Sequence, residues 1–211
     1  MSLRIMETRH EIIEVTGAPG SGKSSFVKAT YPDGMILLGG MPLPYGTARR
    51  ILYSIFLPCY AGATGAVGLR QLWWLAKQAA SYDETLFNRM NALRNSMTKF
   101  GYGFFTARAR EPWVIDEGIS HIPFILGLGK AEIEAFVDLF HAHLMKQRII
   151  FIETPPKEIL IQRLTTRGHK RLRTARDAEA FVERNRTIAV QYKQALLAAG
   201  LEVTCAEVNP C

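Results

Sequence analysis

A glycine-rich octapeptide near the N-terminus constrains this chain more than any other feature. Its residues are Gly17, Ala18, Pro19, Gly20, Ser21, Gly22, Lys23 and Ser24. They match the pattern G-x-x-x-x-G-K-[S/T] in full, with an apolar run before them and a helical pattern after them. Glycines let the backbone turn tightly and aim its N–H groups at a phosphate, and the following helix adds a partial positive charge. The octapeptide therefore predicts a loop that binds the phosphates of a nucleoside triphosphate.

The polar residues of this loop have expected roles in binding ATP with Mg²⁺. We expect Lys23 to reach the β- and γ-phosphates and the hydroxyl of Ser24 to be a magnesium ligand. Ser25, the next residue, is also expected to bind the nucleotide. The sequence therefore predicts ATP and Mg²⁺ as cofactors.

Apolar runs of strand length alternate with helical patterns along the chain, which is typical of an α/β protein with a mostly parallel sheet. The expected strands are Glu11–Thr16, Gly34–Leu38, Trp113–Asp116, Arg148–Glu153 and Leu201–Val208. The expected helices lie near Ser24–Ala29, over Lys130–Gln147, after Pro155-Pro156 and over Asp177–Ala199. The length of 211 residues fits a single domain, 1–211. Residues 49–110 have helical patterns without a clear strand, and we expect a helical insertion there that covers an acceptor site.

The third expected strand ends in two acidic residues, Asp116 and Glu117. A phosphate-binding loop of this type needs a carboxylate near its metal, and a neighbouring strand is the usual source. We expect Asp116 to orient Mg²⁺, and either Asp116 or Glu117 to accept a proton from an attacking hydroxyl. A strand that merely ends in a solvated Asp-Glu-Gly turn is the alternative interpretation.

The segment after the fourth expected strand is strongly basic. Between Arg163 and Arg186 there are eight Lys or Arg residues and three Asp or Glu residues, a net charge of +5. Arg163 and Arg167 lie four residues apart and would share one helix face, and a basic loop with Arg171 follows. We expect a lid at about 167–177 that brings Arg167 and Arg171 onto the transferring phosphoryl group. A solvated charged helix is the alternative.

Taken together, these features resemble the nucleoside and nucleotide kinases among the P-loop kinases, and thymidylate kinase especially. The resemblance rests on the phosphate loop, the strand ending in Asp116, the segment 155–168 and the Glu183-Arg184 pair, and it covers the N-terminal forty residues and roughly the last hundred. It implies a P-loop NTPase fold with a five-stranded parallel core, an acceptor-binding insertion and an arginine lid over ATP. The family's loop lysine and lid arginines correspond to Lys23, Arg163, Arg167 and Arg171.

The acceptor-side residues depart from that family. Leu38-Gly39-Gly40-Met41-Pro42 replaces the Arg-Glu-Pro-Gly-Gly-like run of thymidylate kinases, and Asp116-Glu117-Gly118 replaces their Asp-Arg-Tyr or Asp-Arg-Ser. The resemblance therefore extends to the ATP-binding half and not to the acceptor. We predict an ATP-dependent kinase for a small-molecule hydroxyl or phosphate acceptor, with a nucleoside or nucleoside monophosphate among the candidates.

Three alternatives stay open from the sequence alone. Residues 51–69 carry no charge and lead to Trp73-Trp74, so the segment 51–74 is either a buried hairpin or a membrane-contacting surface that presents a lipid-linked glycan acceptor. A non-enzymatic ATP-binding switch is the second, although the chain lacks the guanine motif Asn-Lys-x-Asp and the signature Leu-Ser-Gly-Gly. The third is a polynucleotide end kinase, against which the confinement of the basic excess to the lid argues.

Composition narrows the classes of protein and partner that remain possible. The chain is 48% hydrophobic and 21% charged, as soluble globular proteins are, and its net charge of +7 favours anionic partners. Its cysteines, Cys59, Cys205 and Cys211, form no CxxC pair, and the N-terminal residues lack an apolar leader. We therefore expect a cytoplasmic protein without a disulfide framework or a zinc site, whose partner is a small-molecule acceptor rather than nucleic acid. The sequence does not define an oligomeric state.

Overall fold

A computed structural model describes residues 12–31, 36–37, 68–81, 85–106, 113–166 and 174–208 of the protein. Its sheet has the strand order β2-β3-β1-β4-β5, and every neighbouring pair of strands is parallel. The strands are β1 (Ile12–Gly17), β2 (Ile36–Leu37), β3 (Trp113–Asp116), β4 (Gln147–Ile152) and β5 (Val203–Ala206). Four strands thus have four to six residues, and the two-residue β2 adds an edge.

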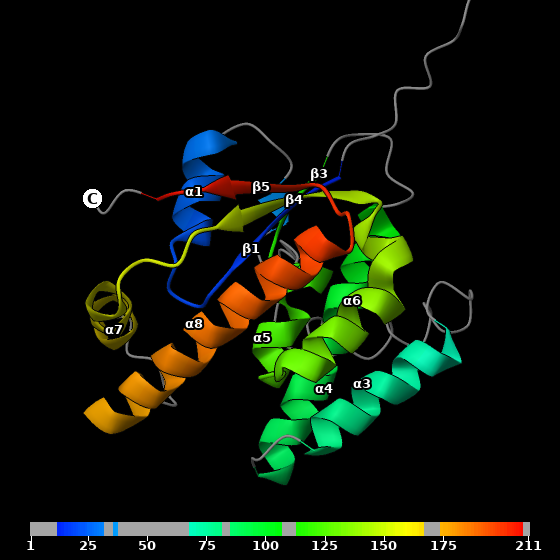
Figure 1. Ribbon diagram of the computed structural model, residues 1–211, viewed down its shortest axis with the longest axis horizontal. Coiled ribbons are helices and arrows are strands. Elements are labelled where there is room, and N and C mark those ends of the chain that lie inside the picture. Colours follow the sequence, from blue (N-terminus) through cyan, green and yellow to red (C-terminus); the bar gives the residue numbers. More distant parts are fainter. Residues whose placement is uncertain are drawn as a thin grey trace, which may run out of the picture.

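Helices cover both faces of this sheet. They are α1 (Lys23–Thr30), α3 (Leu69–Ser81), α4 (Leu86–Thr106), the 3-10 helix η1 (Ile119–His121), α5 (Ile122–Leu126), α6 (Lys130–Leu144), α7 (Lys157–Thr166) and α8 (Ala175–Ala198). Figure 1 shows α1 on one side of the sheet, with α5, α6 and α8 on the other and α3 outside them. The predicted α/β class, with parallel strands flanked by helices, is confirmed.

Alternate residues along the strands face the two helical layers, because successive side chains of a strand point to opposite faces. In β4, Ile150 and Ile152 pack in one cluster with Val27 of α1. Ile149 and Phe151 point the other way, into the larger core. A parallel strand buried on both faces needs apolar residues, which explains the apolar run of residues 149–152 in β4.

Aromatic side chains tie the predicted insertion to the rest of the domain. The Phe136 and Phe140 rings of α6 lie 4.8 Å apart, centroid to centroid. Phe100 of α4 lies 4.9 Å from Phe140, and Trp74 of α3 lies 6.0 Å from it. Residues 68–81 and 85–106 are helical apart from short flanks and contain no strand, whereas the predicted insertion's residues 49–67, 82–84 and 107–110 lie outside the described residues.

Two features differ from the prediction. No helix was expected after β3, yet η1 and α5 occupy Ile119–Leu126, a span too short for a helical periodicity to be visible. The long C-terminal helix begins at Ala175, because Thr174 and Asp177 form a reciprocal capping box at its N-terminus. Residues 175–177 of the predicted lid are therefore helical, and residues 167–173 lie outside the described residues.

Tyr192 of α8 gives a test of this core. Its side chain is fully buried among Phe124, Phe136 and Phe151, and its hydroxyl has no hydrogen-bond partner among the described residues. A buried hydroxyl without a partner keeps its desolvation cost. We therefore expect Tyr192→Phe to leave the free energy of unfolding unchanged or to raise it by up to about 1 kcal/mol in urea denaturation.

Phe136→Ala is the reference for this measurement, because it removes a fully buried ring and should cost about 3–5 kcal/mol. A loss of more than about 1 kcal/mol in Tyr192→Phe would show that the hydroxyl has a partner and contradict this description of the core.

Candidate functional site

The glycine-rich octapeptide, residues 17–24, links β1 directly to α1 and is called the phosphate loop below. The Lys23 ammonium donates hydrogen bonds to the carbonyl oxygens of Gly17, at 3.1 Å, and Ala18, at 2.9 Å. Gly22 has a φ of 101°, a value that residues with a side chain rarely adopt, and it is the N-cap of α1. The loop thus curls around the lysine amine.

The start of α1 offers a place for an anion. Gly22 supplies no side-chain cap, and the first turn of the helix contains no acidic residue. The first N–H groups of a helix have no acceptor within the helix and carry a partial positive charge, so they favour a phosphate.

Arg163 braces the phosphate loop from α7. Its guanidinium donates hydrogen bonds to the carbonyl oxygens of Gly20, at 3.2 Å, and Ser21, at 3.3 Å. The structure therefore brings this predicted nucleotide-binding arginine onto the loop backbone. The other two predicted lid arginines, Arg167 and Arg171, lie outside the described residues.

β3 lies beside β1 in the sheet and brings Asp116 to the phosphate loop. The strands pair with Val15 opposite Asp116, and the Ser24 hydroxyl donates a 2.7 Å hydrogen bond to Asp116 Oδ2. Asp116 is buried, which raises the pKa of its carboxyl, while the bond from Ser24 opposes that rise. The two residues predicted to bind the metal are thus in direct contact.

These two residues fit a magnesium ion. Asp116 Oδ1 is buried and has no hydrogen-bond partner among the described residues, so an acceptor oxygen next to the Ser24 hydroxyl is available to a cation. Mg²⁺ prefers such oxygen ligands and commonly completes its shell with phosphates and waters. The described part of the chain has no group of three or more His, Cys, Asp or Glu residues that could hold a metal.

Glu117 turns back over the phosphate loop. Its N–H donates to the Val15 carbonyl oxygen, at 3.1 Å, and its φ of 65° is the only positive value of a non-glycine residue in the described ranges. Its carboxylate lies 3.1 Å from Lys23 Nζ, 3.5 Å from His121 Nε2 and 3.9 Å from Lys99 Nζ. Burial acts to raise the pKa of Glu117, but His121, Lys23 and Lys99 outweigh it and hold the pKa well below its usual range.

Two of these partners, Lys99 of α4 and His121 of η1, were not expected from the sequence. Burial lowers the pKa of His121 to about 3, so the imidazole is neutral near pH 7. Burial also lowers the pKa of Lys99, while the nearby carboxylates of Glu117, Glu14 and Asp116 act to raise it. Glu117 therefore lies between two lysine side chains from separate parts of the chain.

Glu14, in the middle of β1, was also missed. Its side chain is fully buried, and its Oε1 accepts hydrogen bonds from the Ser120 hydroxyl and, at 2.8 Å, from the Ser120 N–H. An ideal Cβ at Gly118 would lie 2.6 Å from Glu14 Cδ, so only glycine lets the turn after β3 approach this carboxyl. Thr16 adds a bond from its hydroxyl to the Ser120 carbonyl oxygen, at 3.2 Å. β1 thus fixes the turn that carries Glu117.

The sequence did contain signals for two of these residues. Glu14 interrupts an otherwise apolar run, which is unusual in a strand buried on both faces. Lys99 continues the helical spacing of the buried residues Ala92, Ser96 and Phe100 in α4, so it falls on the face that packs inward. For His121 no local pattern is evident, because the short η1 has no periodicity.

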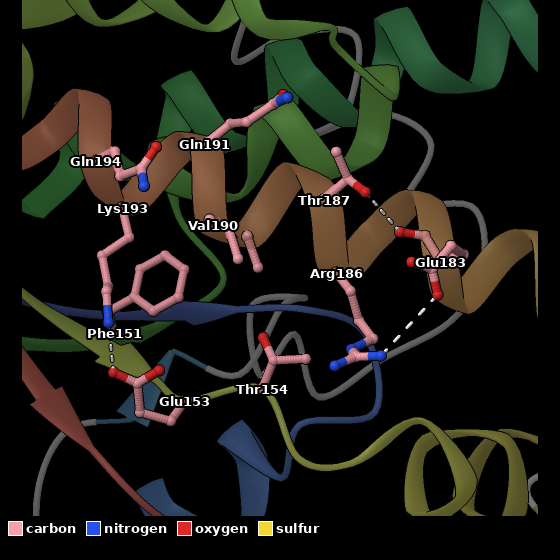
Figure 2. A pocket seen from close by; sticks show the side chains of 11 residues that line it. Phe151, Glu153, Thr154, Glu183, Arg186, Thr187, Val190, Gln191, Lys193 and Gln194 are labelled. Carbon is pink, nitrogen blue, oxygen red and sulfur yellow. Dashed lines mark hydrogen bonds and ion pairs between the residues drawn. The ribbon is translucent and has the colours of Figure 1, made fainter.

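A separate cavity of about 530 Å³ lies between α8 and the end of β4. Figure 2 shows Lys193 pointing at Glu153 and Arg186 pointing toward Glu183 along its walls. The Lys193 and Glu153 charges are 2.7 Å apart. No residue of the phosphate loop lines this cavity, so we do not include it in the candidate site.

Compared with known proteins, the chain matches no family model and no curated protein.

In the described ranges, no helix is long and apolar enough to cross a membrane. Of the predicted membrane-contacting segment 51–74, residues 51–67 lie outside the described residues. Trp74 packs on Phe136 and Phe140, whereas Leu69 and Trp73 are 85% and 75% exposed. One of the two tryptophans therefore belongs to the core.

Glu14 makes stability depend on pH. Burial is the main cause that raises the pKa of Glu14 from 4.5 to about 7. The unfolded chain has released most of this proton by pH 5, whereas the folded protein holds it until about pH 7, so the folded state loses about 2 kcal/mol of stability through this group as pH rises from 5 to 7. Glu14→Gln keeps the Oε1 acceptor for Ser120 and does not titrate. We therefore expect the variant to gain about 2 kcal/mol relative to the wild-type protein between pH 5 and pH 7 in urea denaturation.

Glu134→Gln, at an exposed position of α6, is the matched control and should follow the wild-type pH dependence. Parallel pH profiles for the wild-type protein and Glu14→Gln would mean that Glu14 is ionised in the fold, contrary to this description.

Proposed function

We propose that the protein is an ATP-dependent kinase with a P-loop NTPase fold, which transfers the γ-phosphate of ATP to a small-molecule acceptor. One observation carries the proposal. The lysine amine enclosed by the phosphate loop and the Ser24–Asp116 pair converge at the carboxyl ends of β1 and β3. This convergence supplies a cation for the phosphates and an oxygen-lined place for Mg²⁺ beside it.

The reaction uses these residues as follows. An acceptor oxygen attacks the γ-phosphorus and forms a new P–O bond, while the bond from that phosphorus to the β,γ-bridging oxygen breaks and leaves its electron pair on ADP. Lys23 binds the β- and γ-phosphates, and Ser24 and Asp116 would hold Mg²⁺, which supplies positive charge to the phosphates. For a hydroxyl acceptor, the released proton goes to Glu117, because Asp116 would be held by Mg²⁺.

The proposed acceptor is a hydroxyl- or phosphate-bearing small molecule, and nucleosides and nucleoside monophosphates are candidates. The exposed Leu69 and Trp73 on α3 favour testing lipid-linked glycans as well, because an amphiphilic acceptor would need an apolar surface of this kind. Arg167 and Arg171 are proposed to close over ATP from the segment after α7. Because the donor is ATP, we place the reaction in the cytoplasm.

Transfer of γ-labelled phosphate from ATP with Mg²⁺ tests this function. The acceptor panel contains nucleosides, nucleoside monophosphates, free sugars and lipid-linked glycans. We expect one labelled product, and we expect Lys23→Ala to lower its rate of formation by at least about 100-fold, because the loop loses its charge on the transferring group. Lys28→Ala, at an exposed position in the last turn of the same helix, is the matched control and should keep the wild-type rate.

An unchanged rate in Lys23→Ala would rule out the proposed role of the phosphate loop. ATP binding that depends on Lys23, without any labelled product from the panel, would instead favour the nucleotide-binding switch.

A further inference from the structure

Lys99 is one of the few buried charged residues of the described chain outside the phosphate loop. It is 6% exposed, although lysine is rarely buried without a specific partner. It comes from α4, inside the predicted acceptor-covering insertion, and it reaches Glu117 Oε2 at 3.9 Å. Lys23 contacts the other oxygen, Oε1, at 3.1 Å. The Glu117 carboxylate therefore separates the lysine of the phosphate loop from the lysine of the insertion.

Binding of ATP would change the contact of Glu117 with Lys23 but not its contact with Lys99. Lys23 now bonds to Glu117 and to two loop carbonyl oxygens. When Lys23 turns to the phosphates of ATP, Glu117 loses its nearest cation and comes to face the triphosphate charge. Lys99 and the neutral His121 then remain as the described partners of the carboxylate. Without the Lys99 charge, the carboxylate would be repelled from the position where it meets an attacking group.

The backbone of Glu117 is a second reason why its carboxylate depends on the charge of Lys99. A φ of 65° is costly for a residue with a side chain and persists only where its surroundings hold it. The backbone is held by the Val15 carbonyl oxygen and, next to it, by the packing of Gly118 on Glu14. These contacts fix the main chain but leave the direction of the side chain to its ionic partners.

We propose that Lys99 is a positioning residue of the transfer reaction, which keeps the Glu117 carboxylate aimed at the attacking group while Lys23 is engaged with ATP. The inference rests on the proposed kinase function. It also gives the helical insertion a direct part in the chemistry, because α4 carries Lys99 on the face that packs against η1 and α5.

Two simpler roles for Lys99 make different predictions. If Lys99 only balanced the charge of Glu14, its loss would not matter once Glu14 is neutralised. If it bound ATP directly, its loss would weaken ATP binding by the same factor as the rate. The proposal requires that its loss lowers the rate through Glu117 and leaves ATP affinity nearly unchanged.

The test uses ATP with Mg²⁺ and water as the phosphoryl acceptor, so that no acceptor has to be identified. Water attacks the γ-phosphorus, the bond to the β,γ-bridging oxygen breaks, and the products are ADP and inorganic phosphate. Single-turnover hydrolysis of γ-labelled ATP gives the rate, and the titration of a fluorescent ATP analogue gives the affinity. Thermal unfolding of each variant shows whether it is folded.

We expect Lys99→Met to lower the single-turnover rate by about 10- to 100-fold while the dissociation constant for the ATP analogue changes less than about threefold. Lys99→Arg should recover most of the rate, because it restores the charge. Lys77→Met, at an exposed position of α3, is the matched control and should match the wild-type protein. In the Glu117→Gln background, Lys99→Met should have no further effect on the rate, since a residue that acts through Glu117 cannot act when that carboxylate is absent.

Several results would overturn the proposal. These are an unchanged rate in folded Lys99→Met, an equal loss of rate and affinity, an undiminished effect in the Glu117→Gln background, or an effect that disappears in the Glu14→Gln background. Failure of the kinase function gives a different result: the wild-type protein would bind no ATP analogue or hydrolyse no ATP, with Lys23→Ala indistinguishable from it. That result would overturn both proposals together.

Discussion

The parallel pairing of β1 with β3 determines the geometry of the candidate site. Because Val15 lies opposite Asp116, the two strands end side by side, and the phosphate loop and the acidic turn leave the sheet at the same edge. The contact between Ser24 and Asp116 follows from this register. A shift of one residue would point the Asp116 side chain to the opposite face of the sheet, away from α1. The register is held from both sides, since each residue of β1 also pairs with β4.

Glu14, Lys99 and Glu117 lie near this edge of the sheet and show how the fold accommodates ionisable groups. Burial raises the pKa of Glu14 to about 7, so this carboxyl is protonated at lower pH, and it accepts hydrogen bonds from Ser120. Lys99 and Glu117 are placed so that each has an opposite charge nearby. Lys99 is buried and Glu117 is half-buried, and for such a pair the desolvation of the lysine offsets much of the attraction. The arrangement therefore makes more sense as a way to orient Glu117 than as a source of stability.

The features that the sequence predicted are local in the chain, whereas those that it missed depend on contacts between separate segments. The turn between β1 and α1 could be predicted because it depends on eight consecutive residues, and the position of Asp116 because it ends an apolar strand. The α/β class and most strand positions followed from apolar runs. The sequence carries signals that Glu14 and Lys99 face the interior, but their partners could not be predicted, because these contacts join segments up to 106 residues apart. His121 left no signal at all, because the short η1 has no periodicity. The start of α8 was placed two residues late, because the capping box of Thr174 and Asp177 extends the helix into the basic segment.

The contacts of Lys23 connect this edge of the sheet to the binding of a nucleotide. Its amine has three partners, two loop carbonyl oxygens and the Glu117 carboxylate, and all three are supplied by the protein. A phosphate that binds there must replace at least the carboxylate, so part of its attraction to Lys23 is spent on breaking the existing ion pair. Glu117 would then be left with His121 and Lys99, its other two ionic partners in the structure. If the protein is the proposed kinase, this exchange on Lys23 would join nucleotide binding to the release of the Glu117 carboxylate.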